Sequence, residues 1–385
     1  MKKLEVSSFE LRVAAFAVAV ATSMTLPAAT NDFYVGASLT VDETHFNTVQ
    51  AAFNAVVKNS DDTTVIHLAP GTYREKVVLS DNSNNVLLLG DERRPQDYVI
   101  SWNDCNSYRT LNGKTYEKVN DAFVADEDAT TNEIEAVTLV GFEIQSKVSG
   151  FEARGVTFFN TAWVEYWNGE HGDVGPGQAL AVRTNGNNPA VFRHCRLISG
   201  QDTFCIYGPA YCEDCYIEGA VDFLYGSKCA LFNRCELYSN NGGYFTADGH
   251  GPGTVKIGYL FWKCRFNVAE GKSSSLGRPW NVGANVWLAD CYLGPRVSEQ
   301  MWSTWGAQEA GKTIYRDYGT RSPVMFTPPN GDGQWGEGII VRGTMEEFWQ
   351  QMEGFGFDSI DDIFSQEAGD WRPVMRNGIE VREAL

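Results

Sequence analysis

The sequence has few basic residues and few long apolar runs. Its 31 lysines and arginines stand against 49 aspartates and glutamates, which gives a formal net charge of −18. Because nucleic-acid binding requires a basic surface, we expect no nucleic-acid partner. The apolar run at residues 13–21 is too short to cross a membrane comfortably, and no other segment approaches the required length. We therefore expect no membrane partner either.

The sequence also lacks the motifs of several common enzyme classes. It has no Gly-x-Ser-x-Gly motif, and its five histidines lie in no recognisable catalytic-triad context. Cys212 and Cys215 form one Cys-x-x-Cys pair, but no second pair and no histidine pair lies at ligand spacing. We therefore expect neither a metal nor another cofactor. The Gly-x-Gly-x-x-Gly pattern at residues 331–336 opens no helix, so we expect no dinucleotide site.

Residues 1–29 have the order of charged, apolar and small residues that is typical of a secretory signal peptide. Lys2, Lys3 and Arg12 precede the apolar run, and small residues follow at positions 19–21 and 28–29. A short apolar helix or a disordered tail is the alternative interpretation. We expect a secreted, extracellular protein. No linker rich in proline or serine interrupts residues 30–385, so we expect them to form a single domain.

What the sequence does contain is a repeat. Cys195, Cys215 and Cys235 recur every twenty residues, and each begins a short strand-like pattern. Units of this kind cannot bury their apolar faces alone and must stack. The repeat therefore predicts a parallel β-helix, in which equivalent positions of neighbouring coils lie about 4.8 Å apart.

Other segments extend this pattern in both directions. Apolar residues at helical spacing in residues 47–58 predict a helix that caps the open end of the solenoid. Residues 101–135 are polar and weakly periodic, and we interpret them as a long surface excursion. Beyond Trp302 the pattern predicts loops, followed by a short terminal helix at residues 345–352 that packs against the side of the solenoid.

The chain has nine cysteines, so at least one is unpaired within a monomer. We expect those at the repeat positions to occupy one inward-facing register as small apolar residues. These are Cys195, Cys215, Cys235, Cys264 and Cys291. Neighbouring coils would also bring two such Cα atoms within bridging range, so a Cys215–Cys235 disulfide is the alternative.

Two acidic residues hold the same place in successive repeats. Asp202 and Asp222 each follow a repeat cysteine by seven residues, so stacking places one carboxyl group above the other. Adjacent carboxylates are unfavourable unless they share a proton or meet a cation. Asp202 alone would be interpreted as a turn residue. Asp222 lies between Val221 and Phe223, and a carboxylate in an apolar strand is costly.

The sequence around this pair resembles the pectinesterases, also called pectin methylesterases. Five segments lie near that family's sequence blocks, in the same order. They are Gly71-Thr72-Tyr73-Arg74-Glu75, Gly177-Gln178-Ala179-Leu180-Ala181, Gln201-Asp202-Thr203-Phe204-Cys205, Asp222-Phe223-Leu224-Tyr225-Gly226 and Leu276-Gly277-Arg278-Pro279-Trp280. The resemblance runs from about Phe33 to Pro323. It implies a single-stranded right-handed parallel β-helix and a monomer of the short, secreted microbial type.

The resemblance also implies an activity, the hydrolysis of methyl esters in pectin (methylated homogalacturonan) with release of methanol. Such a reaction modifies the cell wall or degrades pectin. Asp222 matches the family nucleophile, and Asp202 matches the general acid that later acts as a base on water. Gln178 and Gln201 match the amide donors to the oxyanion. Arg278 matches the arginine that orients the nucleophile.

Several further residues are expected to contact substrate. Trp280 matches an aromatic residue that packs against the sugar, and Thr138 aligns with a substrate-contacting threonine. Tyr225 stands where relatives have phenylalanine and is expected to line the cleft. Gln178 and Arg278 are expected to contact substrate as well. Cys205 stands where relatives usually have tyrosine, so the subsite preferences depart from the family pattern.

Two other functions fit the same scaffold. A pectate lyase would need a calcium site built from several acidic residues and a basic catalytic residue, and Gln178 and Gln201 would then have no role. A non-catalytic carbohydrate-binding or wall-structural protein would have no reason to keep Asp202, Asp222 and Arg278 together.

Overall fold

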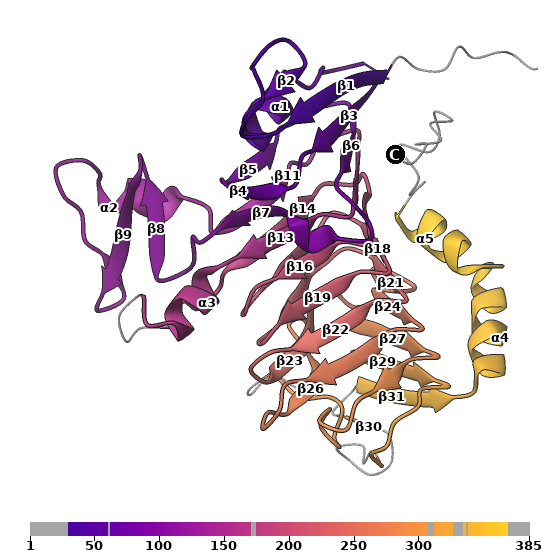
Figure 1. Cartoon of the computed structure of the whole chain (residues 1–385). Coiled ribbons are helices and arrows are strands. Elements are labelled where there is room, and N and C mark those ends of the chain that lie inside the picture. The colour runs from indigo at the N-terminus through magenta and orange to yellow at the C-terminus, as the bar shows by residue number, and fades with distance from the viewer. Residues whose placement is uncertain are drawn as a thin grey trace, which may run out of the picture.

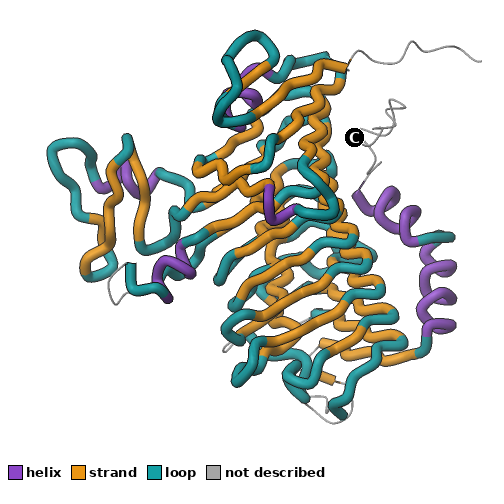
Figure 2. The backbone as a smooth tube through the Cα atoms, in the orientation of Figure 1, coloured by secondary structure: helices purple, strands orange, loops and turns teal. Residues whose placement is uncertain are grey.

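The chain folds into a parallel β-helix, as the repeat predicts (Figure 1). The structure is a computed structural model that describes residues 30–60, 62–170, 175–305, 312–325, 334–335 and 338–368. The predicted signal peptide, residues 1–29, lies outside the described residues, as do the glycines of the 331–336 pattern. None of the described helices is long and apolar enough to cross a membrane. In the described part of the chain, strands dominate and the few helices lie at the periphery (Figure 2).

Three parallel sheets form the walls of the solenoid within the described residues. The first sheet has the order β2 (His45–Phe46), β1 (Thr30–Val35), β3 (Thr63–Leu68), β6 (Asn85–Leu89), β12 (Gly150–Arg154), β15 (Ala190–Arg193), β18 (Ala210–Glu213), β21 (Ala230–Asn233), β24 (Tyr259–Trp262), β27 (Asn285–Ala289), β29 (Ile314–Tyr318), β31 (Gly338–Gly343) and β30 (Gln334–Trp335). The last pair, β31 and β30, is antiparallel.

The second sheet, which will carry the site, has the order β26 (Ser274–Pro279), β23 (Gly243–Asp248), β20 (Leu224–Gly226), β17 (Phe204–Tyr207), β14 (Leu180–Asn185), β11 (Val140–Ile144) and β5 (Val77–Leu79). The third sheet has the order β28 (Tyr292–Leu293), β25 (Arg265–Val268), β22 (Glu236–Ser239), β19 (Tyr216–Gly219), β16 (Arg196–Ile198), β13 (Thr157–Asn160), β7 (Tyr98–Trp102) and β4 (Gly71–Arg74). A short 3₁₀ helix, η1 (Pro95–Asp97), precedes β7.

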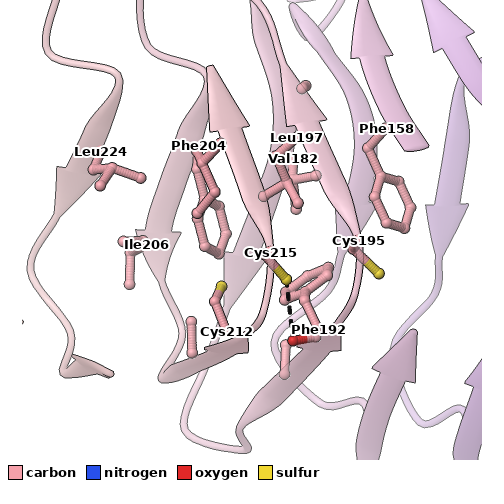
Figure 3. Close-up of a cluster of buried hydrophobic side chains, with 14 of the residues drawn as sticks. Phe158, Val182, Phe192, Cys195, Leu197, Phe204, Ile206, Cys212, Cys215 and Leu224 are labelled. Carbon is pink, nitrogen blue, oxygen red and sulfur yellow. Dashed lines mark hydrogen bonds between the residues drawn. The ribbon is translucent and has the colours of Figure 1, made fainter. Parts of the chain in front are cut away.

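Apolar side chains from all three sheets fill the interior (Figure 3). Aromatic rings pack edge to face along the axis, as between Phe158 and Phe192 and between Phe192 and Phe204. The turn between the first and third sheets needs one residue with a left-handed backbone conformation, and this residue precedes the repeat cysteine in each coil. His194, Asp214 and Arg234 have φ values of 50°, 52° and 55° there. One backbone conformation therefore repeats at this corner along the stack.

The predicted capping helix is present as α1 (Val49–Ala55). The side chain of Thr48 caps its N-terminus by accepting from the Ala51 amide, and Val49 and Phe53 face the core. The helix covers the end of the solenoid next to β1 and β5 (Figure 1). It shields apolar residues that an open end would expose.

The prediction for residues 101–135 is too simple. The segment forms an antiparallel sheet of β8 (Tyr108–Leu111), β9 (Lys114–Val119) and β10 (Ala122–Phe123), followed by α2 (Thr131–Ala136). Its small core contains Tyr116, Phe123 and Ile134. Together these elements project from the side of the solenoid (Figure 1). Asn112 and Gly113, both at positive φ, make the tight turn between β8 and β9, and this Asn-Gly pair is the hairpin indicator that the sequence interpretation overlooked.

The prediction of loops beyond Trp302 is also wrong in part, because β29 and β31 continue the first sheet. The β29 sequence carries Arg316 and Asp317, and these charged residues interrupt the apolar pattern that would indicate a strand. The Arg316 guanidinium lies 4.0 Å from the centre of the Trp287 ring, so a charged residue takes the place of an apolar one on this face.

The predicted terminal helix is confirmed as α4 (Met345–Phe355), and a second helix that was not predicted, α5 (Ile360–Ala368), follows it. Both run along the outer face of the first sheet (Figure 1). Phe348 and Met352 of α4 pack on outward-facing Trp287 and Tyr318 of that sheet. The helices thus cover a sheet face that would otherwise expose large aromatic side chains.

The expected inward register of the repeat cysteines is confirmed, and the alternative disulfide is not formed. All nine cysteines are free and buried. Each repeat thiol donates instead to a main-chain carbonyl of the preceding coil, as from Cys215 to Phe192 (3.3 Å, Figure 3) and from Cys235 to Cys212 (3.3 Å). Side chains in register on parallel strands stay about 4.8 Å apart, whereas a disulfide needs Cβ atoms about 3.8 Å apart.

We predict that nine thiols per chain are titrated when the purified protein is unfolded without reductant, because all nine cysteines are free. A parallel sample unfolded after reduction is the control and should give the same count. A count lower by two before reduction would reveal a disulfide and contradict the free-thiol arrangement.

Candidate active site

The two aspartates lie at the N-terminal ends of the neighbouring strands β17 and β20 of the second sheet, so the stacking predicted from the repeat is present. Asp202 and Asp222 precede β17 and β20, whose register pairs Phe204 with Leu224 and thereby sets the aspartates at the same height of adjacent coils. The Asp202 amide donates to the Val221 carbonyl (3.1 Å), which continues this register up to the site. Both have positive φ, 64° and 52°. Aspartate tolerates this conformation better than most residues. The same backbone turn in the two coils therefore presents both side chains in the same way.

Arg278 pairs with one of these carboxylates. Its Nε donates to Asp222 Oδ1 (2.9 Å), and its Nη2 donates to Asp222 Oδ2 (2.6 Å). Arg278 lies on β26, and the small residue Ala247 on β23 separates it in register from Tyr225 on β20. The predicted pairing of Arg278 with one carboxylate is therefore present, in the two-pronged form that a guanidinium makes with a carboxylate.

Two aromatic residues that the sequence interpretation missed hold the Arg278 side chain. The centre of its guanidinium lies 4.2 Å from the Tyr244 ring centre and 4.0 Å from that of Trp305. The plane is thus held between two rings, which favours a cation and fixes its orientation. Tyr244 follows Gly243 at the start of β23 and could have been suspected, but nothing near Trp305 in the sequence points to Arg278.

The surroundings of the two carboxyl groups differ. Burial, together with the neighbouring Asp222 charge, raises the pKa of Asp202 to about 8, against a hydrogen bond from Gln201 and the charge of Arg278, which both lower it. Burial also raises the pKa of Asp222 above its ordinary value, but the hydrogen bonds and charge of Arg278 work against it. Asp222 therefore loses its proton first, and Asp202 keeps a proton near neutral pH.

Gln178 and Gln201 occupy adjacent coils beside this pair. A parallel bridge joins their backbones, and the Ala179 amide donates to the Gln201 carbonyl (3.1 Å). Gln201 immediately precedes Asp202. The spacing of about one coil between Gln178 and the aspartates, inferred from the sequence, is thus present, and two amide side chains lie at the edge where the carboxyl groups meet.

Aromatic residues line the other end of the second sheet. Trp280 is 39% exposed, and its ring stacks on Tyr207 with 6.5 Å between centres. Tyr225 meets Trp280 edge to face at 5.8 Å. Tyr225 and Trp280, which are both expected to contact substrate, therefore lie against each other, and Tyr207 is a third member of this aromatic group that the sequence interpretation missed. Half-exposed aromatic rings of this kind bind the apolar faces of sugar rings.

The side-chain polar atoms of Thr138 and Cys205 are buried. The Thr138 hydroxyl is buried and has no hydrogen-bond partner among the described residues, while its carbonyl accepts from Lys76 Nζ (2.5 Å). Cys205 is fully buried in register with Tyr225, beneath the aromatic surface. Burial raises the pKa of the Cys205 thiol to about 12, so this group is unreactive as a nucleophile.

The arrangement combines a paired, ionised carboxylate with a protonated neighbour. The first group can attack an electrophilic carbon, and the second can protonate a leaving group. Gln178 and Gln201, which lie in adjacent coils beside this pair, carry amide N–H donors of the kind that can stabilise an oxyanion. The part of the chain that the structure describes holds no cluster of three or more histidine, cysteine or acidic residues that would bind a metal ion.

Comparison with known proteins points to one family. A family model described as Pectinesterase matches residues 38–146 and 134–325. Pectinesterase 31 of Arabidopsis thaliana is 30% identical over 283 residues, which cover 71% of this chain and 79% of that protein. The matched relative is a plant protein, so the comparison supports the family rather than the microbial subtype expected from the sequence.

Solved structures share the fold. Pectin methylesterase from carrot has a TM-score of 0.64 at 17% identity, covering 92% of this chain and 98% of the carrot chain. A pectin methylesterase in complex with a hexasaccharide has a TM-score of 0.60 at 18% identity, covering 90% of this chain and 99% of its own.

The raised pKa of Asp202 predicts a pH-dependent gain from Asp202→Asn. The ordinary pKa is 3.8 and that in the fold about 8, so between these values the folded chain holds a proton that the unfolded chain releases. Raising pH through this window therefore destabilises the wild type. The asparagine variant should escape this loss, with a Tm at least about 2 °C above wild type at pH 9 and no gain near pH 4.

The matched control is Asp290→Asn, which changes an aspartate of similar backbone conformation (φ 51°) at a more exposed corner. Its Tm should stay close to wild type at both pH values. A Tm gain for Asp202→Asn that did not depend on pH would contradict the raised pKa.

Proposed function

Because this chain belongs to the pectinesterase family, we propose that its stacked aspartates hydrolyse the methyl esters of pectin at the N-terminal edge of the second sheet. The observation that carries the proposal is the unequal environment of the pair. Asp222 is held by the two-pronged contact with Arg278, and Asp202, without such a contact, has its pKa raised to about 8. One group is thereby suited to attack and the other to donate a proton.

In the first half of the reaction, the Asp222 carboxylate attacks the carbonyl carbon of the methyl ester. The carbonyl oxygen becomes an oxyanion, which the side-chain amides of Gln178 and Gln201 stabilise. When the tetrahedral intermediate collapses, the C–O bond to the methoxy group breaks, and Asp202 gives its proton to the leaving oxygen. Methanol departs, and Asp222 is left joined to the galacturonyl carbonyl as an anhydride.

In the second half, Asp202 is a carboxylate and takes a proton from water, while the water oxygen attacks the galacturonyl carbonyl. The anhydride bond breaks, Asp222 regains its charge beside Arg278, and a galacturonate carboxyl group leaves. Each aspartate returns to its starting state. Arg278 supports Asp222 in both halves, because the same guanidinium faces the carboxylate whenever it is free.

The substrate that fits this site is a methylated polygalacturonate chain. The exposed ring of Trp280, with Tyr207 and Tyr225 beside it, offers a surface on which a sugar ring can pack near the carboxyl groups. The related protein in complex with a hexasaccharide supports an extended sugar as ligand. Thr138 stays a proposed substrate contact, and its carbonyl accepts a hydrogen bond from Lys76.

We also propose that the protein acts outside the cell as a monomer, with residues 1–29 serving as the signal peptide and residues 30–385 as one domain. The charged, apolar and small residues of that leader support secretion. Pectin is itself extracellular. The continuous core from Phe33 to Ile340 supports a single domain, because one cluster of buried residues joins both ends of the solenoid.

The proposal predicts that the wild type releases methanol from highly methylated pectin and that Asp222→Asn reduces turnover to background. An amide is a far poorer nucleophile than a carboxylate. Methanol release is measured directly, together with the Tm of each variant to establish folding. Asp290→Asn is the matched control and should keep wild-type turnover. Near-normal methanol release by Asp222→Asn would sink the nucleophile assignment, and a wild type that released none would sink the proposed function itself.

Arg278→Lys should lower kcat by about 10- to 100-fold, because lysine supplies a point charge in place of a planar two-pronged donor. Loss of the paired contact also weakens the effect that holds down the pKa of Asp222. The acidic limb of the pH–rate profile should therefore move to higher pH. The alkaline limb, which reflects loss of the Asp202 proton at about pH 8, should stay in place.

The matched change is Arg321→Lys, at an exposed arginine that also faces an aspartate, and it should leave both limbs unchanged. If Arg278→Lys kept most of its kcat and an unshifted acidic limb, Arg278 would serve substrate binding rather than Asp222.

A further inference from the structure

An aromatic helix lies next to the site and has no role in the chemistry described above. Helix α3 (Ala162–Trp167) lies in the connection between β13 and β14 and carries Trp163, Tyr166 and Trp167. It sits where the projecting antiparallel sheet meets the solenoid (Figure 1). The centre of the Trp163 ring lies 5.6 Å from that of Trp167 and 6.2 Å from that of Tyr166, so Trp163 packs against both rings.

Trp163 makes a hydrogen bond to the residue that precedes Gln178. Its indole Nε1 donates to the Gly177 carbonyl (3.0 Å). Gly177 has a φ of 66°, a conformation that glycine adopts without cost, and this bend directs the chain into Gln178. The Gln178 carbonyl in turn accepts from the Asn106 amide (2.7 Å), so the backbone on either side of this turn is held.

The same indole ring lies against the residue that precedes Gln201. A Cβ atom placed on Gly200 would stand 2.3 to 2.5 Å from three ring atoms of Trp163, closer than real contacts allow. Gly200 is therefore glycine because the ring occupies the space where a side chain would be. The ring rests directly on the main chain at that point.

One side chain thus touches the residue before each glutamine, and the two glutamines are joined by a backbone bridge. From this juxtaposition we infer that Trp163 is a positioning residue, which sets the placement of the Gln178 and Gln201 amides relative to Asp222. The inference rests on the proposed function, in which these amides stabilise the oxyanion.

The helix itself is anchored to the same strand that follows Gln178. Asn160 accepts from the Ala162 amide through Oδ1 (3.1 Å), and its Nδ2 donates to the Leu180 carbonyl (3.2 Å). Helix α3 and the start of β14 are therefore tied together by a buried asparagine. A displacement of Trp163 would be transmitted to both glutamines, and oxyanion donors lose much of their effect when they are misplaced by a fraction of an ångström to 1 Å.

The test compares two changes at Trp163 on highly methylated pectin. Phenylalanine has counterparts of the three ring atoms near Gly200 but lacks the indole N–H, so Trp163→Phe removes the hydrogen bond to Gly177 and keeps the contact with Gly200. Trp163→Ala removes both contacts. We expect kcat to fall about threefold to tenfold for phenylalanine and at least about tenfold for alanine, with KM within about twofold of wild type.

Both pH limbs should remain at their wild-type positions, because Asp202, Asp222 and Arg278 are untouched. Val164→Ala is the matched control on the same helix, since Val164 is 37% exposed, and it should leave kcat unchanged. A purely structural role for Trp163 would lower Tm and leave kcat of the folded enzyme within twofold of wild type, and that outcome would overturn the inference.

A double-mutant cycle keeps the inference testable if Trp163→Ala folds poorly. Gly200→Ala forces its new methyl group into the Trp163 ring and should lower kcat by about tenfold in the wild-type background. In the Trp163→Phe background the same clash remains, whereas in the Trp163→Ala background it is relieved, so Gly200→Ala should then cost little further kcat. Additive losses in both backgrounds would refute the coupling. Because wild-type methanol release is measured alongside, failure of this inference is distinguishable from failure of the proposed function.

Discussion

The requirement that two carboxyl groups share one corner of neighbouring coils governs the rest of this structure. Strands in register lie about 4.8 Å apart, too close for two ionised carboxylates without compensation. Arg278 provides the compensation for Asp222, and Asp202 remains protonated because its own burial is not offset in that way. Stacking two buried carboxyl groups lowers the stability of the fold, but it also leaves one group ionised and the other protonated.

The β-helix turns sequence period into spatial order at this site. Neighbouring coils deliver the residues of the set to the same ends of their strands, with the glutamines joined by a bridge and the aspartates aligned by the β17–β20 register. Arg278 comes from β26, beyond β23, and its guanidinium reaches Asp222 while it lies against the Tyr244 ring of β23. Hydrogen bonds between strands fix the coil spacing on which these contacts depend, and buried aromatic rings and thiols fill the interior behind the sheets.

Aromatic side chains surround the polar groups and hold them in place. Tyr244 and Trp305 enclose the guanidinium of Arg278, and Trp163 lies against the turns that lead into both glutamines. Large rigid rings are suited to this task, since they lose little conformational freedom and contact many atoms. The projecting antiparallel sheet takes part as well, because Asn106 from its base binds the backbone at Gln178.

The sequence by itself determined the solenoid, the capping helix and the residues that meet at the site, because repeat period and local motif survive without knowledge of the fold. It also placed the repeat cysteines inside, from one register. The hairpin at Asn112 was indicated by its Asn-Gly pair and was overlooked, whereas the strand pattern beyond Trp302 is obscured by charged residues such as Arg316 and Asp317. Only the tertiary structure decided that Cys215 and Cys235 stay unbridged, that Trp305 covers Arg278 and that Trp163 touches both Gly177 and Gly200. These contacts join residues that lie far apart along the chain or in irregular connections, and their geometry is set by how coils pack rather than by any local pattern of residues.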